Sequence, residues 1–126
     1  MDTSVLIDLL DPGVLAALPA DAAVSTISVA ELTAGPQLAA DALERARRIS
    51  HLQRVEALFD PIPFDREAAR SYGLVVAAVT SAGRSDRSRL ADLLIAAVAH
   101  AGQLELYTRN PGDLAGIGAL LTIVAV

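Results

Sequence analysis

The chain has 126 residues, of which 53% are hydrophobic and 3% aromatic, and it carries a formal net charge of −5 at pH 7. This length predicts one domain over residues 1–126, the acidic balance excludes nucleic-acid binding through an overall positive potential, and the lack of Cys excludes disulfides and thiolate metal sites. No apolar run approaches the roughly 20 residues of a membrane span and no export signal is visible, so we expect a cytoplasmic protein.

Two transitions from strand to helix are predicted in the first third of the chain. Residues 3–7 are typical of a strand end that turns into a short helix, and Asp11-Pro12-Gly13 is a turn signal. Residues 22–27 have the β-branched content of a buried strand. Ser28 is the predicted N-cap of the next helix and forms a Ser-x-x-Glu capping box with Glu31, which by itself would explain Glu31.

The middle of the chain predicts two helical regions separated by a short strand. Residues 37–59 alternate charged and apolar positions at helical spacing, which indicates one amphipathic helix or a pair of helices. Asp60-Pro61 ends this region, and residues 62–64 form the expected strand. Asp65 then caps a helix that runs to Gly83.

Residues 90–101 carry the strongest helical pattern in the sequence. Asp92 lies in this segment but off the predicted apolar face. That face is formed at helical spacing by Leu90, Leu93, Leu94, Ala97, Val98 and Ala101.

The end of the chain predicts two further strands. Gly102 ends the preceding helix, residues 104–108 form one strand, Asn110-Pro111-Gly112 makes a turn, and residues 120–126 form the last β-rich run. Because strands alternate with helices along the chain, we predict an α/β fold in which helices flank a central, mainly parallel sheet.

Four acids stand at the edges of apolar segments. Asp2, Glu31 and Asp113 each follow a predicted strand, and Asp92 lies near a helix start. Each has a separate structural explanation, as a capping, turn, helix-dipole or solvated residue. The carboxyl ends of parallel strands, however, form the crevice where ligands bind, and clustered carboxylates raise one another's pKa unless a cation is present. The combination therefore predicts a site for Mg²⁺ or Mn²⁺.

These acids lie in four segments, DTSVLID, SVAEL, DLLIAAVAHA and TRNPGDLAGI. Together and in this order, the segments resemble the signatures of PIN-domain ribonucleases, in particular the VapC toxins of bacterial toxin-antitoxin modules. The resemblance covers nearly the whole chain. It implies one PIN domain, an α/β/α sandwich, and a Mg²⁺-dependent, site-specific endoribonuclease that cleaves structured RNA such as tRNA or rRNA and blocks translation.

The resemblance also implies roles for individual residues and partners. Asp2, Glu31 and Asp92 would be the core acids and Asp113 the fourth acid of the metal pocket. Other polar groups would orient these carboxylates, namely the hydroxyls of Thr3, Ser4 and Thr108 and the amide of Asn110. Similar proteins form homodimers and are silenced, in higher assemblies, by a VapB antitoxin whose C-terminal tail lies over the acidic pocket.

The sequence departs from the family pattern at two positions. Only Met1 precedes Asp2, where similar proteins have a few apolar residues that complete the first strand. Either the native start lies upstream or this central strand is unusually short. Leu114 follows the last acid where the family commonly has Phe, which keeps an apolar anchor at this position.

The ten basic residues are all Arg. Arg84, Arg87 and Arg89 precede Asp92, and we expect them either to hold the RNA backbone or to form a solvated loop. The arginines between residues 45 and 54 are most simply a solvated helix face, although they are also available to RNA or a partner. The two His residues, His51 and His100, are interpreted as surface or helix-end residues rather than ligands.

Other functions with clustered acids fit less well. A receiver domain needs a Lys, which this chain lacks, and a haloacid-dehalogenase-type phosphatase needs Asp-x-Asp, where the chain has Asp2-Thr3-Ser4. The remaining alternative is a catalytically inactive PIN-like module that binds RNA or protein. The presence of all four acids favours the nuclease, because a binding module has no need for such concentrated negative charge.

Overall fold

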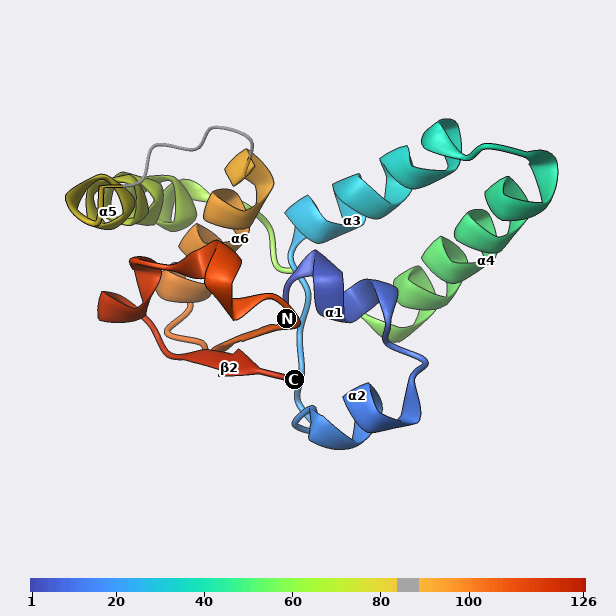
Figure 1. Cartoon of the computed structure of the whole chain (residues 1–126), viewed down its shortest axis with the longest axis horizontal. Coiled ribbons are helices and arrows are strands. Elements are labelled where there is room, and N and C mark those ends of the chain that lie inside the picture. The colour runs from blue at the N-terminus through green and yellow to red at the C-terminus, as the bar shows by residue number, and fades with distance from the viewer. Residues whose placement is uncertain (84–88) are drawn as a thin grey trace.

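The computed structural model describes residues 1–83 and 89–126. Its helices pack around a small sheet, and α3 and α4 project together away from α5 and α6 (Figure 1). The helices are α1 (Thr3–Ile7), α2 (Pro12–Ala17), α3 (Thr26–Ala34), α4 (Ala42–Leu58), α5 (Arg66–Ser81) and α6 (Leu90–Ala101). The strands are β1 (Leu106–Thr108) and β2 (Ile123–Ala125), and short 3-10 turns occupy η1 (Gly35–Leu38), η3 (Pro111–Leu114) and η4 (Ile117–Ala119).

The strands β1 and β2 pair in parallel, with Leu106 opposite Ile123. Backbone hydrogen bonds extend this order to segments from the first half of the chain. The N–H of Asp2 donates to the carbonyl of Tyr107 over 2.9 Å, and the Met1 ammonium donates to the carbonyl of Ala23 over 2.9 Å. The first two residues therefore lie between β1 and the segment that leads into α3.

The segment that leads into α3 is paired in turn with the residues that precede α5. Ser25 and Ile62 form a parallel bridge, and the N–H of Ile62 donates to the carbonyl of Val24 over 2.8 Å. The predicted α/β class with a parallel sheet among helices is confirmed. The predicted strands 22–27 and 62–64 were too long, because regular pairing there is limited to the bridge.

Aspartate and serine side chains begin helices α1 to α5. Asp2, Asp11, Asp41 and Asp65 each accept a hydrogen bond from a backbone N–H in the first turn of the helix that follows. The predicted cap at Asp65 is confirmed. Asp11-Pro12-Gly13 was wrongly interpreted as a turn, since Asp11 caps α2 and Pro12 occupies its first position, where proline needs no hydrogen-bond partner.

The predicted cap of α3 was displaced by one turn. The hydroxyl of Ser25 accepts a hydrogen bond from the backbone N–H of Ser28 over 3.2 Å. The N-cap of α3 is therefore Ser25 and not Ser28. Ser28 is fully buried inside α3. Glu31 is therefore in the second turn, and a capping box with Ser28 does not explain it.

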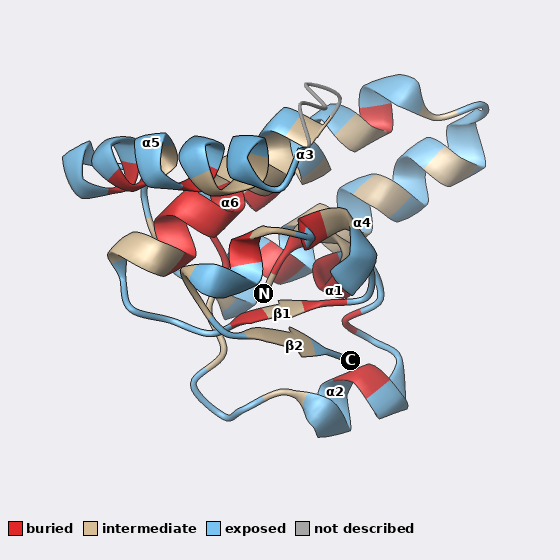
Figure 2. Cartoon of the chain, turned by 60° about the vertical axis from the view of Figure 1, so that its left-hand side comes forward, coloured by how far each residue is buried: buried red, intermediate tan, exposed pale blue. Residues whose placement is uncertain are grey.

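The core consists of α6 and the elements around it, together with a smaller cluster under α1 (Figure 2). Helix α6 has the predicted bounds, but its burial departs from the predicted apolar face. Leu90 is 51% exposed, whereas Ile95 and Ala96, which lie off that face, are buried. Elements pack around α6 on several sides, so burial at its centre follows position along the helix more than a single stripe. None of the helices in residues 1–83 and 89–126 has the length and apolar character to cross a membrane.

Gly116 lies where the chain passes closest to the end of α5, and this contact generates a stability prediction. Its φ is +92°, and a Cβ atom there would stand 2.9 Å from the Cβ of Ala82. Gly116→Ala is expected to lower the free energy of unfolding by about 1–3 kcal/mol, because strain and overpacking both act.

The exposed Gly73, inside α5, has no atom within 4 Å of such a Cβ. Gly73→Ala is therefore expected to raise stability by about 0.5–1 kcal/mol. Urea unfolding of both variants measures the difference, and equal shifts would contradict this account of Gly116.

Candidate acidic active site

Asp2 is a buried carboxylate at the end of the first extended segment. Its side chain is 5% exposed, although it belongs to a charged residue. Its Oδ1 accepts hydrogen bonds from the Ser4 hydroxyl over 2.6 Å and from the Val5 N–H over 3.2 Å. Asp2 is thus both the cap of α1 and a carboxylate with a fixed direction.

Glu31 is linked from α3 to the start of α1. The Thr3 hydroxyl donates to Oε1 of Glu31 and lies 3.2 Å from the Ser28 hydroxyl. Because the segment before α3 pairs with the first residues of the chain, α1 and α3 start at the same edge of the sheet. The bond from Thr3 therefore holds the Glu31 carboxylate against the first residue of α1, the residue that follows Asp2.

Asp92, in the first turn of α6, has a pKa that depends on its burial and on the other three acids. Burial raises the pKa of the half-buried Asp92 carboxyl above its ordinary range, and the negative charges of Asp2, Glu31 and Asp113 raise it further. The Arg89 guanidinium opposes this shift. Charge effects fall off with distance, so the other three acids lie near enough to Asp92 to influence its carboxyl.

Asp113 lies in η3, and its carboxylate forms an ion pair with Arg89, immediately before α6. The turn predicted at Asn110-Pro111-Gly112 is a 3-10 turn that carries Asp113 toward α6. Arg89, predicted as an RNA contact, therefore lies within the acidic site. Arg84 and Arg87, predicted for the same role, lie outside the described residues.

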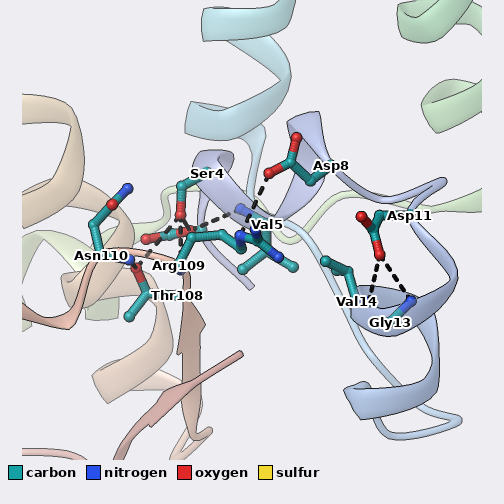
Figure 3. Close-up of polar contacts among 10 residues, drawn as sticks. Ser4, Val5, Asp8, Asp11, Gly13, Val14, Thr108, Arg109 and Asn110 are labelled. Atoms are coloured by element: carbon teal, nitrogen blue, oxygen red, sulfur yellow. Dashed lines mark hydrogen bonds and ion pairs between the residues drawn. The ribbon is translucent and has the colours of Figure 1, made fainter.

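Hydrogen bonds join the end of β1 to Ser4 (Figure 3), whose hydroxyl in turn donates to Asp2. The hydroxyls of Ser4 and Thr108 are 3.5 Å apart, and the backbone N–H of Arg109 donates to the Ser4 hydroxyl over 3.0 Å. The backbone N–H of Asn110 donates to the Thr108 hydroxyl over 3.0 Å. The polar residues predicted around the acids are therefore brought together, and Asn110 takes part through its main chain.

Arg109 is a residue of this site that sequence analysis missed. Its Nε lies 3.4 Å from Oδ2 of Asp8 at the end of α1, so the pair ties β1 to α1 beside Ser4 (Figure 3). The signal was its position between Thr108 and Asn110 in the TRN segment.

Neither His residue is a fully exposed surface group, because both are half-buried and hydrogen-bonded. His51 Nε2 lies 2.8 Å from the carbonyl of Leu6, and His100 Nδ1 lies 2.9 Å from the Ser71 hydroxyl. His100 stands in the last turn of α6, as expected of a helix-end residue, while His51 joins the middle of α4 to α1.

The donor set at the acids suits a hard divalent cation. Within residues 1–83 and 89–126, no three Asp, Glu or His side chains are close enough to form a metal site by themselves. Mg²⁺ usually takes only one or two carboxylates directly and keeps several waters, so carboxylates at wider spacing still fit it. Burial and the charges of the other acids both raise the pKa of Asp92, and a divalent cation beside its carboxylate would oppose that shift.

The chain matches the family model for the PIN domain over residues 1–117. It therefore belongs to the PIN-domain family. It is 35% identical over 121 residues to Ribonuclease VapC5 of Mycobacterium tuberculosis. The aligned region covers 94% of this chain and 87% of that protein.

Two solved structures have the same fold. One is a VapBC toxin-antitoxin system, VapBC-5 from M. tuberculosis, with a TM-score of 0.82 and 34% identity over 99% of this chain and 95% of that one. The other is FitAcB from Neisseria gonorrhoeae, with a TM-score of 0.78 and 26% identity over 98% of this chain and 94% of that one.

The raised pKa of Asp92 generates a pH prediction for the metal-free protein. An acid whose pKa is higher in the folded state contributes stability below its unfolded value of about 4, and this stability is lost as the pH rises through the folded value. Asp92→Asn stays neutral, so at pH 7 it is expected to unfold at a higher temperature than the parent. The gain should vanish near pH 4. Thermal unfolding in EDTA-containing buffers tests this, with the exposed α4 cap variant Asp41→Asn as the control that gains nothing.

Proposed function

We propose that this chain is a metal-dependent, site-specific endoribonuclease toxin of the VapC type, folded as one PIN domain over residues 1–126. The observation that carries the proposal is the half-buried Asp92 of a PIN-family chain, whose pKa is raised by burial and then by the charges of three other acids. Membership of the family and 35% identity to a protein named as a ribonuclease support the reaction class. Structured RNA such as tRNA or rRNA is the proposed substrate.

The metal-binding residues in this proposal are Asp2, Glu31, Asp92 and Asp113, and the ion is Mg²⁺, with Mn²⁺ as a substitute. When bound, such an ion supplies positive charge to the scissile phosphate and acidifies an attacking water. The carboxylates hold this position at the edge of the sheet, and Asp2 is kept in one direction by Ser4 and Val5. The hydrogen bonds of the two His rings run to Leu6 and Ser71 rather than to any of the four acids, so the proposal assigns the proton of the attacking water to a carboxylate.

The proposed partner is a VapB antitoxin, and the proposed setting is the cytoplasm. Support comes from the two solved relatives, whose names describe a VapBC toxin-antitoxin system and the FitAcB protein. A homodimer that assembles further with the antitoxin is proposed on the same resemblance. The alternative function, an inactive PIN-like module that binds RNA or protein, gives no reason for all four acids to be present.

Cleavage of total tRNA and rRNA by the purified chain is the direct test. Discrete fragments are expected with Mg²⁺ or Mn²⁺ and none with EDTA. Asp2→Asn and Asp92→Asn are each expected to lower the rate of RNA cleavage by about a hundredfold or more and to remove growth toxicity, because each removes the charge of a metal ligand. Both should remain folded, since Asn changes little volume at either position and, at Asp2, caps α1 as well as Asp does. Full toxicity in either variant would contradict the metal assignment.

The Ser4 hydroxyl generates a second prediction about the same site. Removing a group that orients a metal ligand typically weakens metal affinity by about 10–100-fold. Ser4→Ala is expected to raise the Mn²⁺ dissociation constant within that range, because Asp2 Oδ1 loses its 2.6 Å contact. Isothermal titration with Mn²⁺ measures this without RNA. The matched control is Ser50→Ala on the exposed side of α4, where no change is expected.

A further inference from the structure

A cavity of about 500 Å³ opens directly beside the acidic site, between α1, α3 and α4. Thr3 and Glu31, which are bonded to each other, form its wall next to the acids. Ile7 and Leu32 line its apolar middle, and His51 and two arginines of α4 lie farther along. The volume falls within the range of about 300–1,000 Å³ that small-molecule sites occupy.

The wall of the cavity on α4 carries two guanidinium groups and one carboxylate. Arg48 is fixed, because its Nε contacts Glu44 Oε1 over 3.1 Å and its terminal nitrogen donates to the Gly35 carbonyl over 2.7 Å. Arg47 is 69% exposed and reaches the same Glu44 only over 3.9 Å. One carboxylate shared by two guanidinium groups leaves an excess of positive charge on this wall, in contrast to the acidic wall at Glu31.

His51 gives the cavity a hydrogen-bonding group with a defined orientation. A carbonyl oxygen only accepts hydrogen bonds, so the 2.8 Å contact with Leu6 requires a hydrogen on His51 Nε2. In the neutral ring, Nδ1 is then an acceptor. The amino groups of adenine, cytosine and guanine are donors that match it.

We propose that this cavity binds one unpaired nucleotide of the RNA substrate beside the scissile phosphate. The nucleotide's own phosphate lies against Arg47 and Arg48, and its base lies between Ile7, Leu32 and His51. Sequence-specific recognition of RNA commonly holds single unstacked bases in this way, on aliphatic, histidine or arginine surfaces. The inference rests on the proposed ribonuclease function and assigns part of its sequence specificity to α4.

A nucleotide is the proposed occupant because the cavity offers its phosphate a cationic group. The chain is acidic overall, with a net charge of −5, so RNA needs local cationic groups to approach four carboxylates. Arg47 is such a group within a cavity that shares Thr3 and Glu31 with the acidic site. Its exposure and long ion pair leave it able to turn toward a phosphate at little cost.

Binding of RNA to full-length chains that carry Asp92→Asn tests the proposal without cleavage. The probe is a fluorescent oligoribonucleotide that spans the cleavage site found with the active chain. It is titrated with protein in a buffer that contains about 2 mM Mg²⁺. Adding Arg47→Gln is expected to weaken binding about tenfold and to reduce the salt dependence by about one phosphate contact. Arg45→Gln is the matched control, because Arg45 lies on the same helix, contacts Gln37 and does not line this cavity.

His51→Gln separates base recognition from structure. The glutamine amide can still donate to Leu6, so α1 and α4 stay joined, but the ring acceptor is lost. In the active chain this variant is expected to change the preference for the base beside the cleavage site, raising KM more than it lowers kcat. Nucleoside monophosphates added to isotope-labelled protein should shift the amide resonances of Ile7, Leu32 and His51.

Each result decides one claim. If the parent chain cleaves no RNA with either metal, the proposed function fails. If it cleaves RNA but Arg47→Gln and Arg45→Gln bind the probe equally well, the nucleotide site is overturned while the nuclease stands. Unchanged RNA affinity together with weaker binding of the cognate antitoxin to Arg47→Gln would make the cavity a protein-docking site and also overturn the inference.

Discussion

A half-buried carboxylate close to other acids, that of Asp92 in the first turn of α6, is the constraint on which the rest of the candidate site depends. Asp2, Glu31 and Asp113 each receive a hydrogen bond or an ion pair from a neighbouring element. Asp92 bears the remaining repulsion, since its pKa is raised by burial and by the other acids. The fold holds this arrangement through packing elsewhere, chiefly between α5 and α6 and around β1. Stability and the acidic site are therefore opposed, and the surrounding core offsets the cost of the acids.

The links that hold the acids come from parts of the chain that are far apart. Asp2 is positioned by β1, through Tyr107, and by the hydroxyl of Ser4 within its own helix. Ser4 in turn receives the N–H of Arg109, a residue 105 positions away. Because these contacts connect the two ends of the chain, the geometry of the site exists only when the sheet has formed. A segment cut from the protein would keep its acids but lose their alignment.

Sequence reasoning succeeded where a local signal decides the structure. Helix α6 has its predicted bounds because a long apolar pattern ends at Gly102, and Asp65 begins α5 because its side chain meets the first turn. It failed where two local signals competed. Ser25 and Ser28 are both good caps, and only pairing with Ile62 determines where the extended segment ends. The cavity along α4 could not be predicted from the sequence, because helix periodicity indicates which side of a helix is buried but not how much space remains between two helices. The role of the four acids could be proposed from their order in the sequence alone, while their hydrogen-bond and ion-pair partners required the fold.

The burial of α6 has a consequence for the unfolded chain. Residues 93–99 form an uncharged run of branched and small apolar side chains that the native packing covers at its centre. Such runs associate with one another when they are exposed during synthesis or refolding. Asp92 and His100 bound this run on its two sides. A charge beside such a run opposes its association, so Asp92 has a second role that does not depend on the acidic site.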